Sequence, residues 1–191
     1  MKKLLTMIAS TVLLAGCLIP EKFDSSVNVA SDGSYTFDYK GTAAHPMAAA
    51  ALKQTGHLSP QDEASLKHEA DSLPQKVADV RSASYLGNAR YQLDIHAVRK
   101  AGQPLQMLEV FNITADKSGL VTIASPVISA KDKKDLSQLG MAVNGTLSVS
   151  LPRNAVVVAQ NATSTPTLGF GSYKWNIGDV GTRPMLQYRL N

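Results

Sequence analysis

Cysteine is almost missing from this sequence, which has one among 191 residues. A single cysteine excludes an internal disulfide framework and any CxxC-type metal or redox site. Aromatic residues make up only 6% and charged residues 18%, and the formal net charge is only +4. We therefore expect no nucleic-acid partner, because phosphate contacts need clustered Lys and Arg. With 44% hydrophobic residues the chain is still apolar enough to fold.

Motifs of catalytic and metal sites are missing too. The four histidines, His45, His57, His68 and His96, form neither the HxxxH nor the HExxH pattern of a zinc site. The sequence contains no GxSxG or SxxK of a hydrolase and no GxxxxGK[ST] or GxGxxG loop for phosphates. We therefore expect a protein that is not an enzyme and that binds neither a metal nor a cofactor.

The N-terminus has the features of a secretory signal. Lys2 and Lys3 form its positive start, residues 4–14 are mostly apolar, and small residues lead to Cys17. The apolar run is too short to span a membrane as a helix. Leu14-Ala15-Gly16-Cys17 resembles the bacterial lipobox, whose cysteine is acylated and becomes the first residue of the mature protein. An ordinary secreted protein with a chance cysteine is the alternative.

The lipobox resemblance divides the chain into three parts. Residues 1–16 would be a signal peptide that is removed, 17–24 a lipidated tether, and 25–191 a single domain. Two or more acyl chains anchor a protein stably, so we expect a cell-envelope protein held in the membrane through Cys17. Bacterial lipoproteins with Asp after the cysteine usually stay in the inner membrane. Leu18 stands there in this chain, which favours the outer membrane, facing the periplasm.

Alternating apolar and polar residues predict an N-terminal hairpin. A three-residue loop at 31–33 would pair Val29 with Tyr35 and keep their side chains on one face. Such a loop needs Gly33 in the left-handed conformation.

Helices and further strands follow this hairpin. We expect helices at 46–54, from Ser59 to about Pro74, and at 129–139. The pattern indicates an α+β fold with a mainly antiparallel sheet, two consecutive helices after the hairpin and a short third helix, with helices covering one face of the sheet. The remaining strands are expected at 91–97, 105–113, 120–124, 143–151, 155–160, 173–177 and 185–190.

A candidate ligand pocket follows from Glu109, a carboxylate that shares the inward register of Met107 and Phe111 in the strand expected at 105–113. Ala-rich helices over the sheet would leave a gap lined by Phe37, Leu93, Met107 and Phe111. An acyl chain could fill this gap with its polar end near Glu109. The alternative is a closely packed core with Glu109 at a bulge or a sheet edge.

A second resemblance covers the C-terminal part. The order of Val-Ser-Leu-Pro at 149–152, Asn161, Trp-Asn-Ile-Gly at 175–178 and a final strand resembles the LppM-type bacterial lipoprotein domain. The resemblance implies a lipid-binding-like α+β fold and brings no catalytic residues. That family usually ends in a membrane-spanning helix, which this sequence lacks, so the lipid at Cys17 would be the anchor. Trp175 is expected to be a core residue in any case.

These observations leave two main function classes. The first is a non-enzymatic envelope lipoprotein that binds a protein partner or supports assembly at the membrane. The second is a binding protein or carrier for a hydrophobic ligand. A solid core with one exposed apolar patch would favour the first, and a large apolar cavity would favour the second.

Overall fold

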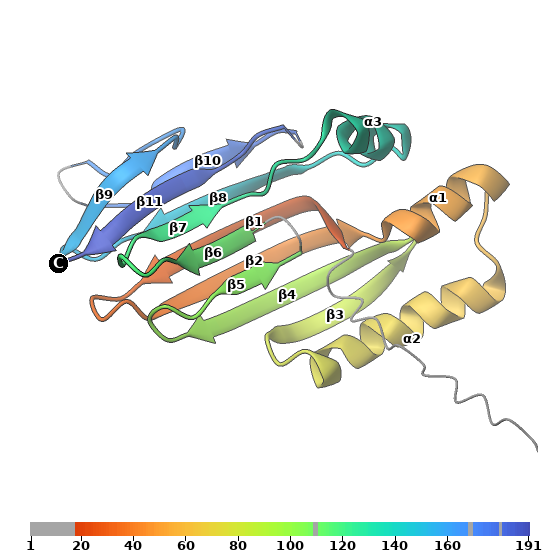
Figure 1. Cartoon of the computed structure of the whole chain (residues 1–191). Helices are drawn as coiled ribbons and strands as arrows, with labels where there is room; N and C mark the ends of the chain where they lie inside the picture. Colours follow the sequence, from red (N-terminus) through yellow and green to blue (C-terminus); the bar gives the residue numbers. More distant parts are fainter. Residues whose placement is uncertain (1–17, 109–110, 168–169, 180) are drawn as a thin grey trace, which may run out of the picture.

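The computed structural model describes residues 18–108, 111–167, 170–179 and 181–191 (Figure 1). The helices are α1 (Pro46–Thr55), α2 (Pro60–Lys76) and α3 (Ala130–Gln138). The strands are β1 (Ile19–Val29), β2 (Tyr35–Ala44), β3 (Val80–Gly87), β4 (Arg90–Arg99), β5 (Leu105–Met107), β6 (Phe111–Ala115), β7 (Val121–Ala124), β8 (Asn144–Ser150), β9 (Ala155–Gln160), β10 (Tyr173–Ile177) and β11 (Met185–Leu190).

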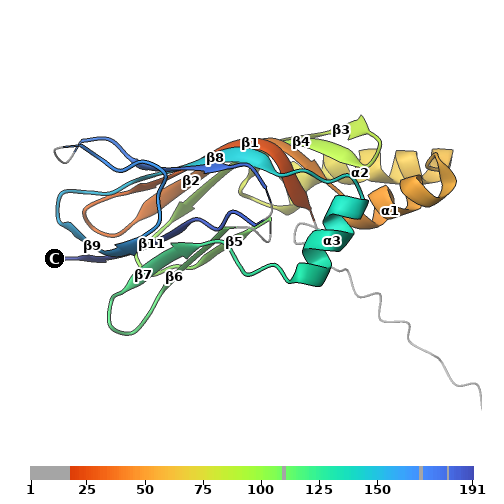
Figure 2. The same cartoon turned by 90° about the horizontal axis from the view of Figure 1, so that it is seen from above.

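The strands form two sheets, which Figure 2 shows as two layers. The larger sheet has the order β10-β8-β1-β2-β4-β3, and the smaller has the order β5-β6-β7-β11-β9. Pairing is antiparallel except between β1 and β8. The predicted α+β class with a mainly antiparallel arrangement is therefore confirmed. The expectation of one sheet is wrong, since the strands divide between two.

The core lies between the two sheets, where aromatic rings meet. Phe111 of the smaller sheet lies 5.7 Å from Phe23 and 5.5 Å from Phe37 of the larger one, measured between ring centroids. The second sheet thus takes much of the place where helices were expected to cover the first. Of the helices, α2 lies alongside the edge strand β3 (Figure 1).

The N-terminal hairpin has the predicted register. Val29 pairs with Tyr35, and the N–H of Ala30 donates to the carbonyl of Ser34 at 2.8 Å. Residues 31–33, between Ala30 and Ser34, form the loop, and Gly33 has a φ of 84°. This left-handed conformation closes the loop, and glycine adopts it without steric cost.

Helix α1 begins at the expected Pro46, and α2 follows the expected cap Ser59. The ring of His45 accepts from the N–H of Ala48 before α1, and Ser59 accepts from Asp62 before α2. Helix α2 continues past Pro74 to Lys76, although a proline was expected to end it. Pro74 lies in the last turn, where only one backbone hydrogen bond within the helix is lost.

Two further expectations about strands are corrected. The single strand expected at 105–113 is a hairpin of β5 and β6, in which Met107 pairs with Phe111 and Leu108 has a φ of 50°. Strand β3 has no counterpart in the sequence analysis. Only Val80 of its residues is buried, so the alternation that reveals a half-buried strand is weak there.

The segment 17–24 was expected to be a tether, but most of it belongs to the sheet. Residues from Ile19 onward lie in β1, which pairs with β2, and Leu18 before them is buried. The register between β1 and β2 shifts between Pro20 and Phe23. This irregularity explains how a proline fits into a paired strand.

Among the residues that the structure describes, no helix is both long and apolar enough to cross a bilayer.

Candidate apolar pocket

The residues predicted to line a ligand gap lie in the core instead. Phe37, Leu93, Met107 and Phe111 are all buried, and the rings of Phe37 and Phe111 are in contact. Phe37 and Phe111 thus pack together across the two sheets and line no gap there. Glu109 lies outside the described residues. The register that pointed its side chain inward assumed one continuous strand, and that strand is a hairpin.

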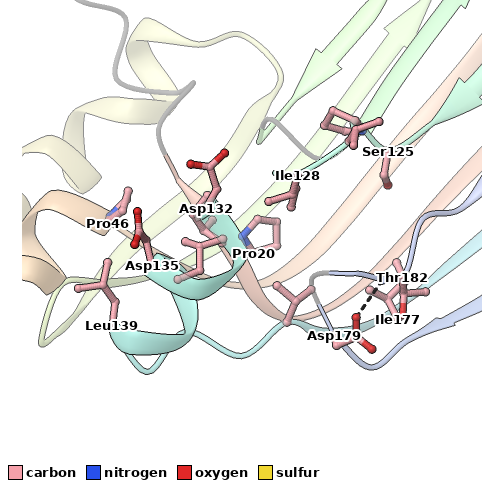
Figure 3. Close-up of a pocket in the computed structure, with 15 residues that line it drawn as sticks. Pro20, Pro46, Ser125, Ile128, Asp132, Asp135, Leu139, Ile177, Asp179 and Thr182 are labelled. Atoms are coloured by element: carbon pink, nitrogen blue, oxygen red, sulfur yellow. Dashed lines mark hydrogen bonds between the residues drawn. The ribbon is translucent and has the colours of Figure 1, made fainter. Parts of the chain in front are cut away.

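A pocket of about 430 Å³ lies elsewhere, at the end of the molecule where β1 begins (Figure 3). It is partly open to solvent, and most of its lining residues are apolar. The lining residues are Ile19, Pro20, Pro46, Ser125, Pro126, Val127, Ile128, Asp132, Asp135, Leu136, Leu139, Val143, Ile177, Asp179 and Thr182.

Helix α3 supplies one wall of the pocket, and its sequence explains this position. Ser129 caps the helix by accepting from the N–H of Asp132 at 3.1 Å, while its hydroxyl donates to the Asp132 carboxylate at 2.6 Å. None of its residues is fully buried. Leu136 of the helix and Leu139, its C-cap residue, both line the pocket.

Three carboxylates border this apolar space, and each has a partner. Asp132 accepts from Ser129, Asp135 pairs with Lys131 at 2.7 Å, and Asp179 accepts from the N–H of Thr182 at 3.0 Å. Within the described ranges no three His, Cys, Asp or Glu side chains are grouped closely enough to hold a metal ion. The pocket therefore combines a mostly apolar lining with three carboxylates that already have partners.

Two large apolar side chains are exposed at the same end of the molecule. Val127, which lines the pocket, is 73% exposed. Met47, which follows the lining residue Pro46, is 67% exposed. Exposed apolar groups beside an apolar pocket are typical of a surface that meets a ligand, a protein or a membrane.

Sequence analysis did not locate this pocket, because its walls come from segments that are far apart in the chain. The start of β1, the start of α1, the segment after β7, helix α3 and the segment after β10 all contribute. One local signal existed. Ser-Pro-Val-Ile at 125–128 is an apolar stretch that belongs to neither a strand nor a helix.

Other side chains singled out from the sequence have structural roles. Trp175 is buried as predicted, and its Nε1 donates to Oδ1 of Asn161 at 2.8 Å. His96 lies 2.7 Å from Asp38, measured from Nδ1 to Oδ1, on the partly exposed polar face of the larger sheet. His45 is buried as the cap of α1.

No family model and no curated protein matches the chain. Among solved structures it is similar to the folded domain of the Mycobacterium tuberculosis LppM protein, determined by NMR. The two chains are 10% identical, with a TM-score of 0.36, and the match covers 95% of this chain and 94% of that one. The resemblance to that domain is loose.

Proposed function

We propose that this protein is a non-enzymatic, lipid-anchored envelope lipoprotein that binds an apolar ligand, such as a lipid acyl chain, in the pocket beside α3. The pocket itself carries the proposal. Its volume of about 430 Å³ lies within the range of ~300–1,000 Å³ that is usual for small-molecule sites. Its mostly apolar lining would hold an acyl chain.

The anchor is the second part of the proposal. The lipobox-like Leu14-Ala15-Gly16-Cys17 supports acylation of Cys17. Mass spectrometry of the mature N-terminus tests it: we expect a chain that starts with an acylated Cys17. A Cys17→Ser precursor should stay unacylated and uncleaved. An unmodified mature chain starting at another residue would contradict the proposal.

Filling the pocket tests ligand binding. Leu139→Trp places a larger side chain in the pocket wall, at the partly buried C-cap position of α3. Leu52→Trp is the control, because Leu52 is also a partly buried leucine but is not among the pocket residues. Native mass spectrometry of the full lipoprotein should show a bound lipid on the wild type and on Leu52→Trp, but not on Leu139→Trp. Equal lipid loading of all three, or none on the wild type, would contradict binding in this pocket.

The partner-binding role has an observation of its own. Val156 and Val158 lie two residues apart on the edge strand β9 and are 48% and 55% exposed. Exposed valines on a strand at the edge of a sheet, as the described residues show it, suit contact with another protein. Cross-linking in intact cells from Val156→Cys should then yield an adduct of defined mass that Lys117→Cys, at an exposed turn, does not yield.

A further inference from the structure

The folded domain begins immediately after the proposed anchor. Leu18 is only 2% exposed, and β1 begins at Ile19. Cys17 is bonded directly to Leu18, so their Cα atoms are about 3.8 Å apart. An acylated Cys17 therefore attaches to the domain without a spacer, and the part of the domain around Leu18 must lie against the bilayer.

The surface at this point is suited to such a contact. Ile19 and Pro20 line the pocket, so the chain enters the domain beside it. The exposed Val127 and Met47 stand at the same end. Figures 1 and 2 both show α1, α3 and the start of β1 at one end of the molecule, with β9 and the C-terminus at the other.

We infer that this end is a membrane-seating surface, in which Val127 and Met47 enter the interfacial region of the bilayer and the pocket opens toward the lipid. The inference rests on the proposed acylation of Cys17. Because the anchor already holds the domain at the membrane, its effective concentration there is high, and burial of two apolar side chains favours the orientation in which they meet the bilayer. A ligand acyl chain could then pass between bilayer and pocket without crossing water.

Spin labelling of the full, acylated lipoprotein in phosphatidylcholine vesicles tests this orientation. The single native cysteine is used by the anchor, so Val127→Cys introduces the one free thiol for a nitroxide label. We expect the label at 127 to collide with oxygen, which concentrates in the bilayer, severalfold more than with a water-soluble nickel complex. Met47→Cys should behave in the same way and guards against a local effect of labelling one site.

Val156→Cys is the matched control, because it is also an exposed valine but lies on β9 beside the C-terminal strand, at the opposite end of the molecule from α1 and α3 (Figure 1). Its label should collide mainly with the nickel complex. If the labels at 127 and 47 also collide mainly with nickel, the seating surface is wrong. If they are shielded from both reagents, this end is covered by protein, such as a second copy, and the inference is equally overturned.

The experiment separates this inference from the proposal on which it rests. Mass spectrometry of the same sample reports whether Cys17 is acylated, and flotation with the vesicles reports whether the protein is anchored. Failure of acylation or flotation contradicts the proposed function. An acylated, floating protein with aqueous labels at 127 and 47 contradicts the seating surface alone.

Discussion

Phe23 occupies a space that two glycines leave open on the neighbouring strands. It pairs with Gly41 of β2 on one side and with Gly145 of β8 on the other. A Cβ atom at Gly145 would lie 2.7 Å from the Phe23 ring and 2.6 Å from its carbonyl oxygen. A Cβ atom at Gly41 would collide with the carbonyl oxygen of Lys22 and with the Cβ of Phe23. The absence of side chains at these positions thus lets Phe23 pack against Tyr39, with ring centroids 5.4 Å apart.

Gly145→Ala should therefore destabilise the protein. The contacted atoms include backbone, so β1 itself would have to move, and overpacking of this kind costs about 1–3 kcal/mol in the free energy of unfolding. Gly178→Ala is the control, because a Cβ atom there meets nothing within 4 Å, and its effect should stay within about 0.5 kcal/mol. Urea unfolding followed by circular dichroism measures both. Equal urea midpoints for the two variants would show that β1 and β8 move enough to accept a Cβ atom at Gly145 without loss of stability.

At the scale of single elements, local chemistry decided what the sequence could predict. The β1–β2 loop and the start of α3 were predictable because each depends on residues within a few positions, such as Gly33 and Ser129. The turn between β5 and β6 was not, because no Gly, Asn or Pro marks it and the non-glycine Leu108 has the positive φ. The alternation of apolar and polar residues continues through 105–113, so it predicted one strand where the structure has two.

The caps of α2 and α3 offer a matched pair of variants. Ser59 and Ser129 make the same contacts, each accepting from an Asp N–H at 3.1 Å and donating to that carboxylate at 2.6 Å. Replacing either by Ala should lower the free energy of unfolding by about 1 kcal/mol. Only Ser129→Ala should also weaken lipid binding, because α3 forms a pocket wall and α2 does not.

Thermal unfolding and native mass spectrometry, applied to both cap variants, provide the measurement. Equal loss of bound lipid in Ser59→Ala and Ser129→Ala would mean that binding follows global stability and not the position of α3.

At the scale of the whole molecule, the sequence pattern could not predict which strands join which of the two sheets. Strand β8 joins β1 in the larger sheet although more than a hundred residues separate them, while β9, which follows it directly, joins the smaller sheet. Alternation shows that a strand has one buried face, but both sheets bury one face against the other, so the pattern is the same in each. The pocket depends on this arrangement, which is why its residues could not be assembled from sequence alone.

The tyrosines of this shared core make the whole fold sensitive to alkaline pH. Burial raises the pKa of Tyr35 and of Tyr188 to about 12, and burial also raises the pKa of Tyr39 and Tyr91. In the unfolded chain a tyrosine titrates near pH 10. The folded protein therefore retains these protons after the unfolded chain has lost them. Their contribution to stability is complete below pH ~10 and is lost as the pH rises toward 12.

Tyr188→Phe tests this linkage, because it removes one of the raised groups while keeping the ring that packs in the core. Tyr188 is fully buried on β11, and no hydrogen bond of its hydroxyl group is among those of the described residues. At pH 7 we expect the variant to unfold within about 1 kcal/mol of the wild type. Above pH ~10 its stability should fall less steeply, because one fewer phenol has to be kept neutral in the folded state. The measurement is the melting temperature of both proteins at intervals from pH 7 to about 11. This range extends above pH ~10, where a tyrosine of the unfolded chain titrates. If the melting temperatures of the two proteins fall in parallel above pH ~10, Tyr188 ionises in the folded state as readily as in the unfolded one. Its burial between the sheets would then not limit the stability of the protein at high pH.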